Sequence, residues 1–68
     1  MRYAIVIEKT PTSYGAYVPD LPGCVAVGKT AAEVKKLIAE VVQLHLEGLR
    51  EDGFPIPEPE TECEYVAI

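Results

Sequence analysis

Few side chains of this sequence combine the residue types and the spacing that catalysis requires. His45 is the only histidine, so any histidine-based proton transfer would have to use it. It falls within the apolar face of a predicted helix, beside Val41 and Leu49, which is more typical of a core or interface histidine. Ser13 is the only serine, and without a neighbouring histidine it is predicted to be a turn residue. No catalytic residue is predicted.

The residues that could bind a metal ion are dispersed. Cys24 and Cys63 lack the paired spacing of a zinc site and the Cys-x-x-Cys spacing of a redox centre. Reduced strand or core residues are the favoured interpretation, and a disulfide or a metal role is the alternative. The acidic run "PEPETECE", residues 57–64, is predicted to be a solvated connector, because a metal site needs oxygens that converge on a fixed frame. Neither a metal site nor a cofactor is predicted.

The remaining carboxylates do not form a pair for acid–base chemistry. Glu8, Asp20, Glu33 and Glu47 are assigned to a strand, a loop, a helix cap and the solvent face of a helix. The tripeptide "GKT" at residues 28–30 resembles part of a nucleotide-binding loop, and Gly23 lies five residues upstream of Gly28 as this motif requires, but residues 24–28 are predicted to be a strand where the motif needs a loop. It is predicted to be a strand end and a helix cap.

The length and composition are those of one small globular domain. The chain has 68 residues, of which 49% are hydrophobic and 25% are charged. A domain of this size buries only about 60% of its unfolded surface, so a thin stability margin is expected. No stretch is long enough to cross a membrane, and the first apolar run is too short for a secretory signal. A cytoplasmic protein is predicted.

The charge balance is acidic. Six basic and eleven acidic side chains give a net charge of −5. This field repels phosphate backbones, so direct binding to nucleic acid is not predicted. A basic protein partner fits the charge better.

Three strands are predicted in the first 28 residues. Residues 2–9, "RYAIVIEK", place Tyr3, Ile5 and Ile7 on one face and Ala4, Val6 and Glu8 on the other. Both faces are apolar at their centre, which predicts either a central strand or a strand whose second face meets a partner. A turn at residues 10–15 leads into a second strand at 14–18, and residues 24–28 are the third.

The segment after residue 28 has the strongest helical pattern in the chain. Thr30 and Glu33 have the spacing of a capping box, in which a hydroxyl and a carboxylate bond two free backbone N–H groups. Gly53 is predicted to end the helix before the proline-rich residues 54–60. The apolar stripe between these ends is centred on Val34, Ile38, Val41 and Leu49.

The C-terminal "ECEYVAI", residues 62–68, alternates charged and apolar side chains and is predicted to be a fourth strand. The expected fold is therefore α+β, with two layers and the antiparallel order β-β-β-α-β. One helix covers only one face of such a sheet. An uncovered face or edge is a common place for two copies to pair, so a homodimer is predicted.

The loop "YVPDLPGC", residues 17–24, is predicted to be stiff. Pro19 and Pro22 fix φ, Gly23 can adopt a positive φ, and Asp20 can bond nearby amides. A stiff loop loses little entropy on binding. The alternative is a turn that serves the fold alone. The candidate partner-binding residues are Tyr17, Asp20 and Leu21.

Two runs of the sequence resemble the N-terminal domain of HicB-family antitoxins. They are "YGAYVPDLPGCVAVGKTAAEV" and, at the end of the helix, "LHLEGLREDGFPIPEP". The resemblance implies a partial RNase H-like fold of three antiparallel strands, a helix and a further strand. It also implies the role of inhibitor in a bacterial type II toxin–antitoxin pair, whose toxin is a small basic HicA-type ribonuclease that cuts mRNA. Family members commonly carry a C-terminal DNA-binding domain; this chain ends at Ile68, so residues 1–68 are expected to be a single HicB-like domain without one.

Three functions stay open on this basis. The favoured one is a non-catalytic antitoxin that neutralises its toxin by masking it. The second is a divergent metal-dependent nuclease on the same fold, for which the strands offer Glu8 without evident companions. The third is a HicB-like domain that binds another regulatory protein or a small ligand.

Overall fold

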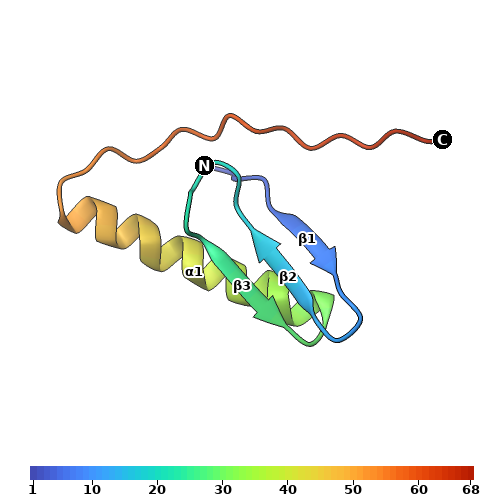
Figure 1. The fold of residues 1–68 in the computed structure, drawn as a ribbon. Helices are drawn as coiled ribbons and strands as arrows, with labels where there is room; N and C mark the ends of the chain where they lie inside the picture. Colours follow the sequence, from blue (N-terminus) through green and yellow to red (C-terminus); the bar gives the residue numbers. More distant parts are fainter.

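Three short antiparallel strands and one long helix form the regular part of the computed structural model, which describes residues 1–68 (Figure 1). They are β1 (Val6–Lys9), β2 (Tyr14–Tyr17), β3 (Val25–Gly28) and α1 (Ala31–Glu51). The sheet order is β1-β2-β3, so β2 is central and β1 lies at an edge. The helix α1 does not combine the length and the apolar character that a membrane span needs.

The first strand is shorter than the predicted range of 2–9. Val6 pairs with Tyr17, the last residue of β2, so residues 2–5 have no β2 backbone beside them to bond. Of the two interpretations of this strand, a central position is wrong, because β1 is an edge strand. The other, a second face that meets a partner, stays a prediction.

The helix starts and stops close to the predicted residues. Thr30 is the N-cap, and its Oγ1 accepts a hydrogen bond from the backbone N–H of Glu33 at 3.0 Å. This is one half of the predicted capping box, and the exposed Glu33 side chain does not supply the other half. After the helix, the N–H of Gly53 donates to the carbonyl of Arg50. The N–H of Phe54 donates to the carbonyl of Leu49. This pair of bonds satisfies the last turn of the helix.

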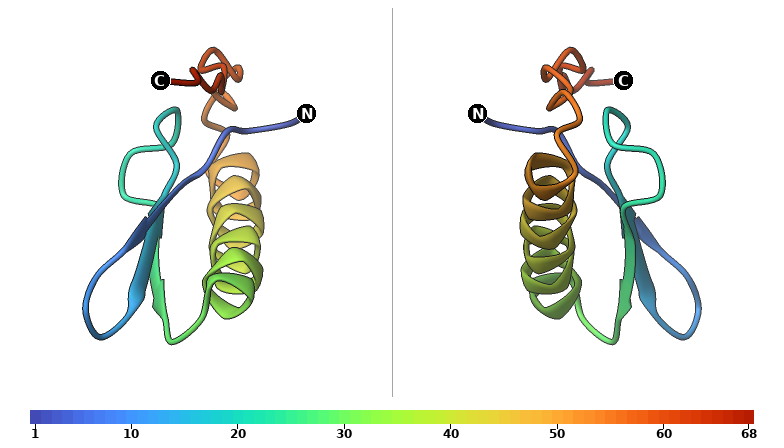
Figure 2. Two further views of the ribbon diagram at one scale, coloured as in Figure 1. Left: turned by 90° about the vertical axis from the view of Figure 1, so that its right-hand side faces the viewer. Right: turned by 90° about the vertical axis from the view of Figure 1, so that its left-hand side faces the viewer.

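The hydrophobic core lies between the sheet and the helix, which form two layers (Figure 2). The helix contributes Val34 and Ile38, two of the four residues predicted at the centre of its apolar stripe, and both are fully buried, whereas Val41 and Leu49 are only partly buried. By contrast Leu44 of the same helix is 69% exposed. The six buried side chains of the core are Ala16, Val18, Leu21, Cys24, Val34 and Ile38.

The predicted fourth strand is wrong. Residues 54–68 run as an extended chain along the top of the molecule in Figure 1, and they form no strand, so the order is β-β-β-α. Every residue from 61 to 68 is exposed, and Tyr65 is 96% exposed. An alternating pattern makes a strand only where a sheet edge accepts its backbone hydrogen bonds. Here the segment is held at two points outside the sheet ladder, described below, and its glutamates favour contact with water.

Two glycines provide a matched test of how closely α1 approaches the sheet. A Cβ built at Gly28 would lie 2.9 Å from the backbone nitrogen of Val34, so Gly28→Ala is expected to destabilise the fold by roughly 1–3 kcal/mol. A Cβ at Gly48, within the helix, meets nothing within 4 Å. Gly48→Ala is therefore expected to stabilise the fold by about 1 kcal/mol through helix propensity. Urea unfolding followed by circular dichroism measures both, and a Gly28→Ala variant as stable as the wild type would show that the helix start is not tightly packed.

Candidate functional site

The loop between β2 and β3 is folded on itself by backbone hydrogen bonds. The N–H of Leu21 donates to the carbonyl of Val18 at 3.1 Å, and the N–H of Cys24 donates to the carbonyl of Leu21 at 3.1 Å. A third bond, from Val18 N–H to the Cys24 carbonyl at 3.2 Å, closes the base of the loop. Gly23 adopts a φ of +89°, as the sequence predicted, which an L side chain would strain. The loop is therefore stiff.

Leu21 is not presented to a partner. Its side chain is 0% exposed and belongs to the core cluster with Val34 and Ile38 of the helix. The turn at Pro19 and Asp20 directs this side chain back under the loop, where burying it removes a large apolar surface from water. The prediction of Leu21 as an exposed contact residue is therefore corrected, because its buried side chain holds the loop against the helix.

Asp20 ties the loop to the C-terminal segment. Its Oδ2 accepts hydrogen bonds from the backbone N–H groups of Glu60 at 3.1 Å and Thr61 at 3.0 Å. Its Oδ1 accepts a hydrogen bond from the Thr61 hydroxyl at 2.8 Å. The sequence predicted bonds from amides near Asp20 in the loop, but the donors lie 40 and 41 positions further along the chain. Asp20 thus acts as an anchor between two distant segments.

These hydrogen bonds lower the pKa of Asp20 below its usual value of 3.8. The backbone N–H of Thr61 is the main cause and the Thr61 hydroxyl the second; the N–H of Glu60 contributes least. All three donors favour the charged carboxylate, whereas desolvation opposes them. Asp20 is therefore fully charged, and the anchor fully formed, at neutral pH.

A second contact holds the C-terminal segment nearer the helix. The Tyr3 hydroxyl donates a hydrogen bond to the carbonyl oxygen of Pro57. Pro57 and Pro59 are half-buried, while Glu58 and Glu60 between and after them are exposed. The segment therefore turns Pro57 and Pro59 towards the body of the protein and these two glutamates towards water.

A groove of about 360 Å³ separates the C-terminal segment from the first strand. Residues 4–7 line one side and residues 61–65 the other. The segment thus runs beside the edge of the sheet without bonding to it, which agrees with the missing fourth strand.

Tyr17 lies on the face of the sheet that α1 does not cover. Its neighbour Ala16 is 4% exposed on the covered face, whereas Tyr17 is 41% exposed. The strand register places Val6, Tyr17 and Val25 side by side, and Val27 lies in the next row. Val25 is 63% exposed and Val27 is 69% exposed. We call these four residues the open sheet face.

The other residues singled out in the sequence are not brought together. Ser13 lies in the β1–β2 turn, where its N–H donates to Thr10 Oγ1 at 3.0 Å, and His45 lies half-buried on the helix. Cys24 is buried and Cys63 exposed, both as free thiols, and burial raises the pKa of the Cys24 thiol. The structure has no group of three or more histidine, cysteine or carboxylate side chains placed to hold a metal ion.

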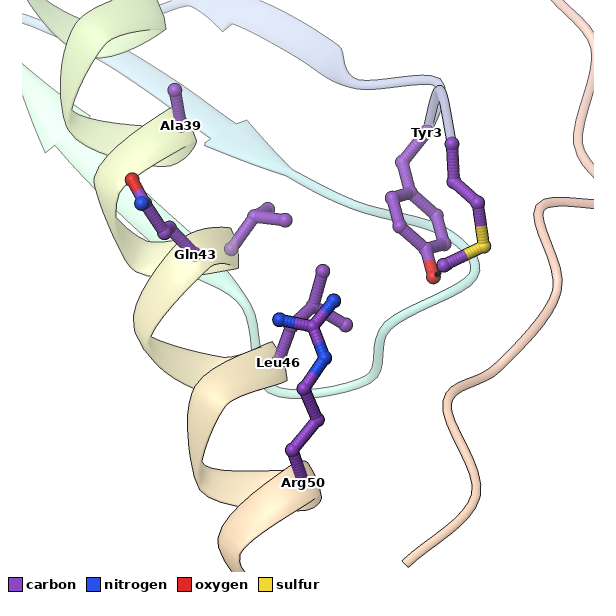
Figure 3. A pocket seen from close by; sticks show the side chains of 7 residues that line it. Tyr3, Ala39, Gln43, Leu46 and Arg50 are labelled. Atoms are coloured by element: carbon purple, nitrogen blue, oxygen red, sulfur yellow. Dashed lines mark hydrogen bonds between the residues drawn. The ribbon is translucent and has the colours of Figure 1, made fainter.

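A shallow pocket of about 260 Å³ lies between the helix and the N-terminus (Figure 3). Its polar groups are the Gln43 amide, the Arg50 guanidinium and the Tyr3 hydroxyl. The last of these is already engaged with Pro57. The residues that line it are Met1, Tyr3, Ala39, Val42, Gln43, Leu46 and Arg50.

Sequence reasoning missed two features of this site. Thr61 carries no local signal, because its hydrogen-bond partner is 41 residues away. Val25 and Val27 did carry a signal, since "CVAVG" is apolar on both faces. One of those faces had to be left without cover by a single helix.

Comparison with known families resolves what kind of protein carries this site. The family model described as the HicB_like antitoxin of bacterial toxin-antitoxin systems matches residues 3–67. This chain belongs to the HicB-like antitoxin family. The resemblance seen in the two sequence runs is thereby confirmed.

Relatives of this HicB-like antitoxin include proteins from a phage, a bacterium and an archaeon. The chain is 36% identical over 66 residues to a 14.9 kDa protein from the rep-hol intergenic region of Haemophilus phage HP1, covering 97% of this chain and 50% of that protein. It is 45% identical over 47 residues to a UPF0150 protein of Helicobacter pylori, covering 69% of this chain and 65% of that protein. It is 35% identical over 63 residues to a UPF0150 protein of Thermoplasma acidophilum, covering 91% of each. The chain thus spans half the length of the phage protein and about two thirds of the Helicobacter protein.

A solved structure has the same fold as this HicB-like antitoxin. One chain of the HicA3 and HicB3 toxin-antitoxin complex superposes with a TM-score of 0.73 at 38% sequence identity. The match covers 88% of this chain and 70% of that chain. The α+β architecture of antiparallel strands and one helix is therefore a HicB-like fold.

Loss of the Asp20 charge is expected to release the C-terminal segment. Because the pKa of Asp20 is lowered in the anchored state, the stabilisation is complete above the usual value of 3.8 and is lost as the pH falls through the lowered pKa. The amide NMR signals of Glu60 and Thr61 should then move to random-coil positions in acid, and in Asp20→Ala at every pH. Glu58→Gln, an exposed change in the same segment, is the control. Identical Thr61 signals in Asp20→Ala and wild type at pH 6 would contradict the anchor.

Proposed function

We propose that this HicB-like antitoxin binds a small basic HicA-type toxin that cleaves mRNA and neutralises it by masking, without catalysis of its own. The observation that carries the proposal is the match to a chain of the HicA3 and HicB3 complex, at 38% identity and a TM-score of 0.73. The family model over residues 3–67 supports the same role.

The distribution of charge supports a basic partner. Residues 1–50 carry six basic and five acidic side chains, whereas residues 51–68 carry six acidic side chains and no basic one. The whole negative field of the chain therefore comes from its C-terminal part, most of which is exposed. Such a field attracts a basic protein, speeds its association and repels nucleic acid. Direct binding to nucleic acid is not part of the proposed function.

A homodimer in the cytoplasm is the proposed working form. The edge strand β1 has one side without a neighbouring strand, and the free backbone groups of an edge are a common pairing site between copies. Bacterial mRNA is made and translated in the cytoplasm, so an inhibitor of an mRNA-cleaving toxin acts there.

The proposal predicts that a small basic protein is encoded next to this chain, and co-expression of the two proteins tests it. Expressed alone, that protein should arrest growth and translation, and co-expression of this chain should restore both. The two purified proteins should then elute together in size-exclusion chromatography, and the complex should no longer cleave mRNA. Ile38→Asp places a charge at a side chain that is 1% exposed, so it should unfold this chain and remove the protection.

Two results would contradict the proposal. One is growth arrest that this chain does not relieve, together with separate elution of the two proteins. The other is cleavage of RNA by this chain alone with Mg²⁺ or Mn²⁺, abolished by Glu8→Gln or Asp20→Asn. The second result would favour a metal-dependent nuclease.

A further inference from the structure

The open sheet face groups apolar side chains on the uncovered side of all three strands. Val6, Tyr17 and Val25 form one row across all three strands, and Val27 follows in the next row beside Gly15. Gly15 has no side chain, so the centre of the second row is flat. Single exposed apolar residues are normal on a protein surface, but a contiguous group marks an interaction site.

An acidic strip crosses one end of the molecule (Figure 1, Figure 2). Glu58, Glu60, Glu62 and Glu64 alternate along the extended C-terminal segment, and all four are exposed. We call these four residues the carboxylate strip.

The two tethers place the carboxylate strip at one end of the sheet. Tyr3, which holds Pro57, precedes β1, and Asp20, which holds Thr61, lies in the β2–β3 loop. Both sites belong to the end of the sheet at which β1 begins, and the segment crosses that end (Figure 1, Figure 2). A protein that covers the open sheet face and extends past this end therefore meets the strip.

We propose that the open sheet face, with the carboxylate strip beside it, is the surface by which this chain covers its basic toxin. This inference rests on the proposed function. Charge selects the occupant: Glu8 lies in the row of Val27, and the four glutamates of the strip outnumber Arg2, the basic side chain that lies beside Glu62. A second copy of the chain would bring the same charges to this border, and like charges oppose contact. A basic protein finds complementary charge there.

The two parts of the surface act on different steps of binding. Apolar contacts at the centre of an interface hold the complex together and set its rate of dissociation. Charges at the rim guide the partner and set the rate of association and its dependence on salt. Substitutions in the two parts should therefore have separable kinetic effects.

The apolar part is tested with two variants that are matched in exposure and charge. Val27 on the sheet and Leu44 on the helix are each 69% exposed, so lysine at either position should leave the fold intact. We expect Val27→Lys to weaken binding of the neighbour-encoded basic protein by at least about tenfold, and Leu44→Lys to change it by less than about twofold. Surface plasmon resonance measures the binding, and thermal unfolding checks that both variants are folded.

The carboxylate strip is tested by changing all four of its glutamates to glutamine. The association rate should fall about tenfold at low salt, its salt dependence should flatten, and the dissociation rate should stay close to that of the wild type. An unchanged association rate at low salt would show that the strip does not face the partner, and would overturn its part in the inference.

The remaining outcomes separate this inference from the proposed function. If Val27→Lys binds the partner as well as the wild-type chain does, the proposed surface is wrong and the proposed function still stands. If only Leu44→Lys loses binding, the partner contacts the helix and not the open sheet face, which overturns this inference. A wild-type dimer that becomes monomeric in Val27→Lys would show that a second copy occupies the face. Failure of the wild-type chain to bind at all overturns the proposed function, and this inference with it.

Discussion

One amphipathic helix covers one face of a three-stranded sheet, and the rest of the molecule follows from that asymmetry. The side chains that the helix can bury all lie between the two layers, with Leu21, Val34 and Ile38 among the most deeply buried. A chain of this size has few such residues, so each contributes a large share of a small stability margin. The opposite face of the sheet has no element to cover it. Its valines and its tyrosine stay in contact with water, which disfavours them unless another molecule packs there.

The C-terminal segment is organised by polar contacts where apolar packing is absent. Asp20 gathers three hydrogen bonds from Glu60 and Thr61, and Tyr3 binds the carbonyl of Pro57. These contacts determine where the acidic part of the chain lies relative to a body that carries almost no net charge. The same proline-stiffened loop therefore contributes Leu21 to the hydrophobic core and Asp20 to the hydrogen bonds that hold the C-terminal segment. Through Asp20 the loop sets the position of the C-terminal segment.

Much of the fold was predictable, because its signals are local. The helix limits follow from the Thr30 cap and from Gly53, and the buried centre of the helix from the spacing of Val34 and Ile38. The site was less predictable. Tyr17 is exposed, as a contact residue must be, but Leu21 is buried and Asp20 is occupied within the chain. A loop sequence does not reveal which of its side chains will bond to or pack against distant parts of the chain.

The amino-acid sequence by itself determined three strands, one capped helix, an acidic C-terminal part and membership of the HicB-like family. Each of these depends on residues close together in the chain or on a pattern that can be compared directly. Only the tertiary structure decided which apolar face stays open, what Asp20 binds and that residues 62–68 form no strand. Those outcomes depend on contacts between segments up to 54 residues apart, for which periodicity and propensity carry no information.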